Sequence, residues 1–231
     1  MLTPAEWQIV ALSLRVSLVA IAAVLPLAFA LAWLLARRRF PGMVLIDALV
    51  HLPLVLPPVV TGYLLLLAFG PQGPAGRLAK SLLGITFSFH WTGAALAAAV
   101  MALPLMVRAI RLSIDAVDTR LESAARTLGA GRWDVFRRVT LPLAAPGVLA
   151  ALVLGFARSI GEFGATITFA SNIPGETRTL PLGIYTALQV PGAEGEVARL
   201  AMISIALSLA ALVASEWLVR RGTNGKGRPV L

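Results

Sequence analysis

Five uncharged apolar stretches of about membrane-spanning length dominate this 231-residue sequence: Val16–Ala36, Ala48–Gly76, Ser81–Val107, Val139–Ala157 and Leu200–Ser215. A helix needs about 17–25 mostly apolar residues to cross the hydrocarbon core of a bilayer. Charged residues make up only 13% of the chain, whereas a soluble domain carries about 25%. The sequence therefore predicts an all-α integral membrane protein with a single transmembrane domain, residues 1–231, and no separate soluble domain.

Charges and turn residues bound the expected transmembrane spans, at about 16–36, 49–69, 91–107, 148–169 and 200–219, with a long inner loop at about 108–147. Fourteen of the 20 basic residues fall on one side of this topology: Arg37, Arg38, Arg39, Arg108, Arg111, Arg120, Arg126, Arg132, Arg137, Arg138, Arg220, Arg221, Lys226 and Arg228. Basic residues accumulate in cytoplasmic loops. We therefore expect a multi-pass protein of the cytoplasmic (inner) membrane, with the N-terminus outside and the C-terminus in the cytoplasm. Because the net charge of +9 gathers at one membrane edge, it indicates lipid contact rather than nucleic-acid binding.

Prolines interrupt several spans, and the second span holds the densest group, Pro53, Pro57 and Pro58. Irregular backbone at membrane depth is tolerated only where protein or a water-filled cavity supplies the missing hydrogen bonds. Two interpretations stay open for this span. It is either a kinked helix that lines the transport pathway or a helix bent by packing alone.

Arg158 and Glu162 are the notable charges inside the expected spans. Their i, i+4 spacing on the fourth span allows them to pair on one helix face. An ionisable residue inside the membrane is a candidate functional residue by default. The alternative is an internal ion pair that fastens the span to its neighbours, and a paired arginine makes a poor trap for an anion. The sequence favours the ion pair.

The inner loop contains a predicted short helix from about residue 121 to residue 128, which Gly129 ends as a C-cap. A second short helix is expected around residues 132–139. Four apolar side chains of the first helix share one face, because they are spaced i, i+3, i+4, i+7: Leu121, Ala124, Ala125 and Leu128. We expect Glu122 and the neighbouring arginines to ring the contact that this face makes.

A face of this kind suits the groove of a protein partner. The alternative partner is the lipid headgroup layer, on which an amphipathic helix could lie. Burial in lipid would be weak, because only two of the apolar side chains on this face are large. The spacing therefore favours a protein partner.

The same loop resembles the signature of bacterial ABC-importer permeases: E-A-A, three residues, G, nine residues, then I-x-L-P. The matching residues, at the correct intervals, are Ser123, Ala124, Ala125, Gly129, Val139, Leu141 and Pro142. Ser123 departs from the pattern, since the family often has glutamate there, and Glu122 lies one place earlier. The resemblance implies a type I ABC importer permease fold, in which this segment is a cytoplasmic coupling helix docked into a groove of a separate ATPase subunit.

The flanking sequence is similar to one branch of that family, the molybdate permeases, over the segments His51–Leu66, Ala97–Asp115 and Ala157–Gly192. The resemblance implies a pore subunit that carries molybdate across the membrane with two copies of the chain, two ATPase subunits and an extracytoplasmic molybdate-binding protein. Sulfate, tungstate and other oxyanions are the alternative substrates. The resemblance implies no enzyme activity, and therefore no catalytic, cofactor-binding or metal-binding residues.

The source of energy can be argued from the residues alone. The sequence has no G-x-x-x-x-G-K-[ST] phosphate loop, and its only lysines are Lys80 and Lys226. ATP hydrolysis is therefore expected in another chain.

The alternative function is an ATP-independent secondary anion transporter, which would use gradient-coupling carboxylates and often inverted repeats. Only Asp47 and Glu162 are candidates for such carboxylates, and this alternative leaves the basic inner loop unexplained.

Overall fold

A computed structural model describes residues 2–224 of the chain. Lys226 and Arg228, which we expected on the cytoplasmic side, lie outside the described residues. Within those bounds the elements are helical: α1 (Pro4–Arg37), α2 (Met43–Val55), α3 (Pro58–Phe69), α4 (Pro74–Leu83), α5 (Trp91–Asp115), α6 (Thr119–Thr127), α7 (Arg132–Val135), the π-helical turn η1 (Phe136–Thr140), α8 (Leu141–Ile160), α9 (Gly164–Phe169), α10 (Leu180–Ala187) and α11 (Glu194–Asn224). The predicted all-α class is confirmed.

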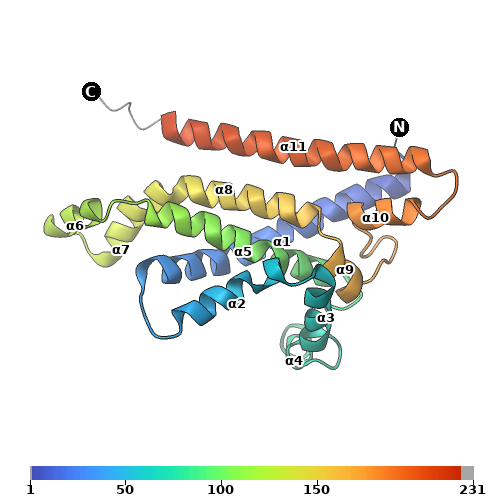
Figure 1. Ribbon diagram of the computed structural model, residues 1–231, viewed down its shortest axis with the longest axis horizontal. Coiled ribbons are helices and arrows are strands. Elements are labelled where there is room, and N and C mark those ends of the chain that lie inside the picture. Colours follow the sequence, from blue (N-terminus) through green and yellow to red (C-terminus); the bar gives the residue numbers. More distant parts are fainter. Residues whose placement is uncertain (1, 225–231) are drawn as a thin grey trace.

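The core of the bundle is formed by α1, α5 and α8, which lie side by side (Figure 1). Helix α5 is the central member, and its buried face is built from alanines, including Ala94, Ala98 and Ala102. Small residues let membrane helices approach closely, and close packing replaces the hydrophobic driving force that lipid does not provide. Larger side chains continue this face toward the C-terminal end of the helix, where Met106 and Ile110 are fully buried.

The number of predicted spans agrees with the structure. Four helical segments are long and apolar enough to cross a membrane (Pro4–Arg37, Trp91–Asp115, Arg132–Ile160 and Glu194–Ala214), and the bent pair α2 and α3 makes a fifth when it is counted as one span. The helices extend further than the predicted spans. Helix α5 continues past residue 108 to Asp115, and α8 begins already at Leu141. Near the end of α5, Arg111 pairs with Asp47 on α2 at 3.2 Å.

The second span is broken rather than kinked. Helices α2 and α3 meet at an angle of 118°, and between them Leu56 and Pro57 adopt extended backbone. A residue that precedes a proline is disfavoured in the α conformation, so Pro57 and Pro58 end α2 and start α3. Pro53, by contrast, is accommodated inside α2.

The expected fourth span is also divided, which the sequence prediction missed. Helix α8 ends at Ile160, and the short α9 starts again at Gly164. Helix α9 packs across α3, the second half of the other broken span. The two backbones touch, because a Cβ atom at Gly62 would lie 2.7 Å from the Ala165 carbonyl oxygen, and one at Gly164 would lie 2.7 Å from Pro58 Cβ. Each break therefore supplies one short helix to a tight crossing.

Helices α6 and α7 project from one end of the bundle, and the N-terminus lies at the other end, near α10 (Figure 1). Helix α11 runs along α8 and exposes many large apolar side chains, among them Met202, Ile205 and Leu209. Such a surface suits contact with lipid or with a second copy of the chain. The amphipathic α4 was not predicted, because its sequence looked like part of a turn-rich loop.

Candidate functional site

Helix α6 is defined at both ends by its own sequence. The Asp118 side chain caps its start by accepting the Arg120 N–H at 2.8 Å. At its end the Gly129 N–H donates to the Arg126 carbonyl and the Ala130 N–H donates to the Ala125 carbonyl, which is a Schellman motif. Gly129 has φ +87°, a conformation that side chains disfavour. The prediction that Gly129 ends this helix is confirmed.

The predicted apolar face of α6 points away from the bundle. Leu128 is 88% exposed and Leu121 is 50% exposed, and Ala124 between them is exposed as well, while Ser123 bonds only to its own helix. Ala125 is half-buried on the edge of the face. An exposed apolar face on a well-capped helix at the tip of the molecule is free to receive a partner.

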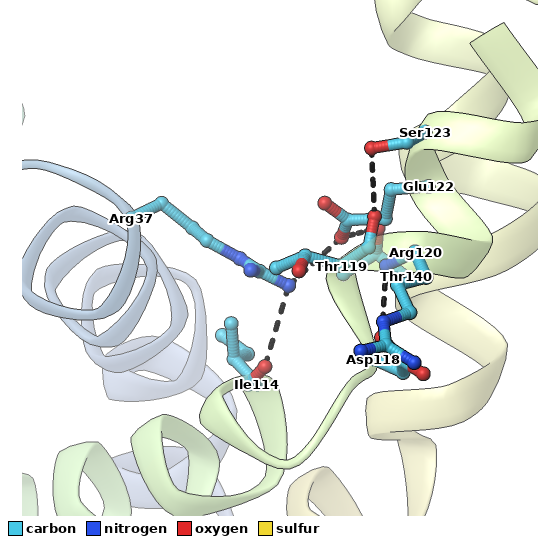
Figure 2. Close-up of polar contacts among 8 residues, drawn as sticks. All are labelled: Arg37, Ile114, Asp118, Thr119, Arg120, Glu122, Ser123 and Thr140. Atoms are coloured by element: carbon cyan, nitrogen blue, oxygen red, sulfur yellow. Dashed lines mark hydrogen bonds and ion pairs between the residues drawn. The ribbon is translucent and has the colours of Figure 1, made fainter. Parts of the chain in front are cut away.

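Glu122 points in the opposite direction, into the molecule (Figure 2). Its Oε1 atom accepts from Arg37 Nη2 at 2.8 Å and from the Thr140 hydroxyl at 2.7 Å. The expectation that Glu122 rings a partner contact is wrong. It lies on the inner face of α6, where one carboxylate oxygen joins α6 to the end of α1 and to η1.

We call the contacts of Glu122 with Arg37 and Thr140 the anchor, and Arg37 extends this anchor to a fourth segment. Its Nη2 atom also donates to the Ile114 carbonyl in the last turn of α5, at 3.3 Å (Figure 2). Because Arg37 and Glu122 keep only 17% and 11% of their side-chain surface exposed, their pairing is only slightly screened by water. A displacement of α6 must therefore either move α1, α5 and η1 or break a nearly buried ion pair.

The second half of the signature leads directly into the membrane. Val139 lies in η1 and is half-buried, whereas Leu141 and Pro142 form the first turn of α8. The signature thus runs without interruption from α6 into a transmembrane helix.

Arg158 and Glu162 form the predicted ion pair, with Arg158 Nη1 and Glu162 Oε2 2.6 Å apart. The expectation that both lie on one helix face is wrong, because α8 ends at Ile160. Glu162 instead lies in the break, where its other oxygen accepts the Ala165 N–H at 2.8 Å and so caps the start of α9. The side chain of Glu162 is only 2% exposed.

A small, open apolar cavity of about 250 Å³ lies between α2 and α3, with Pro53, Leu56 and Thr61 in its wall. The Thr61 hydroxyl is buried and has no hydrogen-bond partner among the described residues. Pro57 and Pro58 do not line this cavity and act instead by fixing the break. Of the three prolines, Pro53 thus lines the cavity, whereas Pro57 and Pro58 fix the break.

Sequence reasoning missed two members of the anchor, Arg37 and Thr140. Arg37 had been counted only as a basic residue that marks the cytoplasmic side, and Thr140 occupies the variable position of the signature. No local pattern could have found them, because their partner Glu122 lies 85 and 18 residues away. Asp118 was detectable, since an aspartate just before a helical segment is a common N-cap.

Known proteins resemble the chain over most of its length. Molybdenum transport system permease protein ModB of Escherichia coli (strain K12) is 59% identical over 227 residues, which are 98% of this chain and 99% of that protein. Sulfate transport system permease protein CysT of the same organism is 42% identical over 160 residues, 69% of this chain and 57% of that protein. The sulfate permease is thus the more distant of the two.

Solved structures support the fold. A bacterial alginate ABC transporter, crystallised in complex with alginate pentasaccharide-bound periplasmic protein, contains a chain with a TM-score of 0.74 and 16% identity to this one, over 95% of this chain and 80% of that chain. The predicted type I ABC importer permease architecture is therefore confirmed. The model of the family described as "Binding-protein-dependent transport system inner membrane component" matches residues 25–223. On this evidence, the chain belongs to the family of inner-membrane components of binding-protein-dependent transport systems.

Proposed function

We propose that this chain is the transmembrane permease subunit of an ATP-driven importer that moves molybdate across the cytoplasmic membrane. The observation that carries the proposal is the two-sided helix α6, exposed and apolar on one face and joined by Glu122 to the end of α1 and to η1 on the other. Molybdate as substrate is supported by the 59% identity to a molybdenum transport permease along nearly the whole chain.

The partner for the exposed face is a cytoplasmic ATPase subunit, because the sequence itself has no phosphate-binding loop. Leu121, Ala124, Ala125 and Leu128 form the docking face, and Gly129 sets where the helix stops. When ATP draws two ATPase subunits together, α6 moves with them. Glu122 and the continuous segment from Val139 through Leu141 and Pro142 transmit this movement to the bundle. ATP can shift the bundle only by favouring one of its two conformations.

Two copies of the chain and an extracytoplasmic molybdate-binding protein complete the assembly. The N-terminal end with α10 faces outward and receives the binding protein, while the α6 end faces the cytoplasm, as the basic residues indicate. The single transmembrane domain extends over residues 1–231. Substrate selection rests mainly with the binding protein. This chain therefore needs weak contacts with the substrate along its path rather than a tight binding site.

The path runs beside the two broken spans. Pro57, Pro58 and the α3–α9 crossing place irregular backbone at membrane depth, where such backbone is tolerated only against protein or a water-filled cavity. Arg158 is neutralised by Glu162, so it maintains the shape of the break without trapping an oxyanion. Pro53 and the cavity of α2 leave room for α2 to shift when α6 moves.

Reconstitution tests the proposal. The permease is placed in liposomes with its ATPase subunits, and uptake of molybdate, tungstate and sulfate is measured with candidate binding proteins added one at a time. We expect ATP-dependent molybdate uptake that requires all three components. Uptake against a gradient by the permease alone, without nucleotide, would instead identify a secondary transporter. ATP-dependent uptake of sulfate but not molybdate would reassign the substrate while leaving the importer intact.

A further inference from the structure

A groove of about 710 Å³ lies where the last turns of α1 meet α7 and η1. None of the α6 residues that we assign to the ATPase docking face lines it. The groove is therefore a separate surface near the inner end of the bundle, and neither the coupling contact nor the transport path accounts for it.

One wall of the groove is a continuous aromatic array. Phe29 stacks on Trp33 one turn later on α1, with ring centroids 6.5 Å apart. Trp33 meets Phe136 edge to face at 5.0 Å, and Phe136 stacks on Trp133 at 5.2 Å. Trp133 remains 69% exposed. Tryptophan side chains are enriched where a membrane meets water, because the ring is apolar and its N–H is polar.

Two arginines, Arg38 and Arg132, stand at the charged end of the groove. Neither has an ion-pair partner among the side chains that the structure describes. The nearby carboxylates are already used, because Glu122 is bound by Arg37 and Thr140, and Asp134 pairs with Arg138 at 3.6 Å. An apolar groove thus ends in two uncompensated positive charges.

We infer that this groove binds one anionic phospholipid of the inner leaflet. The lipid phosphate would lie between Arg38 and Arg132, and an acyl chain would run along α1 past Trp33 and Ala30 to Phe29. From Arg38 to Phe29 the helix rises about 13 Å, which is close to half of the roughly 30 Å hydrocarbon core. Basic pockets between transmembrane helices on the cytoplasmic side suit anionic headgroups.

The inference rests on the proposed orientation, which puts this end of the bundle in the cytoplasmic leaflet. It also connects the lipid to the coupling machinery. Arg132 lines a second, smaller cavity that contains Arg37, Glu122 and Thr140, the members of the anchor. A lipid phosphate on Arg132 would therefore change the electrostatic surroundings of the ion pair that holds α6 to α1.

Native mass spectrometry of the purified complex of permease and ATPase subunits tests the inference, with phosphatidylglycerol as the anionic probe and phosphatidylcholine as the zwitterionic one. We expect one phosphatidylglycerol per permease, bound about tenfold more tightly than phosphatidylcholine. Arg38→Gln combined with Arg132→Gln should abolish this preference. Ala30→Phe should weaken binding with both arginines intact, because the new ring fills the path of the acyl chain.

The matched control is Arg39→Gln combined with Arg137→Gln, which removes the same charge from exposed neighbours that do not line the groove. This variant should keep the tenfold preference. Equal binding of both lipids by the natural chain, or equal loss in the control, would overturn the inference. Binding by the isolated permease but not by the complex would also overturn it, because a protein partner would then cover the groove.

Molybdate uptake measured with the same preparations separates this inference from the proposed function. A complex that imports molybdate but shows no lipid preference would contradict the lipid site alone. A complex that binds phosphatidylglycerol through the two arginines but transports nothing would support the lipid site and contradict the proposed function.

Discussion

Glu122 and Glu162 are both buried glutamates paired with an arginine, but they serve the bundle differently. The partners of Glu122, Arg37 and Thr140, lie 85 and 18 residues away, so its carboxylate joins separate segments. The partners of Glu162 lie within four residues, on either side of the break between α8 and α9. The sequence separation of the partners, rather than burial or residue type, decides whether such a carboxylate fixes tertiary structure or the shape of one segment.

Glu122→Ala is expected to have the largest effect on the permease. The change leaves Arg37 nearly buried and unpaired, which should lower the free energy of unfolding by about 3 kcal/mol. Thermal unfolding of the purified permease in nanodiscs measures the loss. Replacing both partners, Arg37→Met with Glu122→Leu, should recover most of it, because no unpaired charge remains. A Glu122→Ala variant as stable as the natural chain would contradict the claim that Glu122 stabilises the tertiary structure.

Glu162→Ala should cost less, about 2 kcal/mol. Arg158 is 25% exposed, so it can find other partners when its carboxylate is gone, while α9 loses its cap. Glu162→Gln should cost about half as much, since the amide oxygen can still accept the Ala165 N–H.

Arg158→Gln tests whether Arg158 has a structural role or lies on the transport pathway. If that variant folds normally but loses oxyanion uptake, Arg158 belongs to the pathway and not to the structure of the break.

Gly129→Val should destabilise the permease by about 1 kcal/mol, since a β-branched residue disfavours φ +87°. No atom within 4 Å would obstruct the added Cβ, so the strain is conformational and confined to the end of α6. We expect normal membrane insertion and weakened co-purification with the ATPase subunits. Gly129→Asn is the control, because asparagine tolerates this conformation better. Undiminished co-purification of the valine variant would count against Gly129 as part of the docking site.

Leu128→Ser should have the smallest effect on the permease itself, within about 0.5 kcal/mol, because the side chain is 88% exposed. Its effect on the complex should be larger. Burial of a leucine in a partner groove contributes about 2 kcal/mol, so affinity for the ATPase subunit should fall roughly thirtyfold. Titration of labelled ATPase subunit measures this. Leu112→Ser, an exposed leucine on α5 rather than α6, should leave the affinity unchanged.

Sequence patterns predicted the features whose causes are local. Helical spacing and a following glycine were enough for α6 and Gly129. The i, i+4 spacing also predicted the contact of Arg158 with Glu162, although the two residues do not share a helix. Hydropathy found the spans because lipid imposes their length. It could not find the break after Ile160, because that segment remains apolar on both sides of the break. The spacing of α6 also could not show that Glu122 points inward, since Arg37 is distant in the chain.

The π-helical turn η1 has a consequence for the evolution of this protein. A π turn holds one residue more than an α turn, and each residue turns a helix by about 100°. Loss of one residue from positions 136–140 would therefore rotate α6 about the α8 axis by more than a quarter of a circle. The ATPase subunit would then meet a different face of α6.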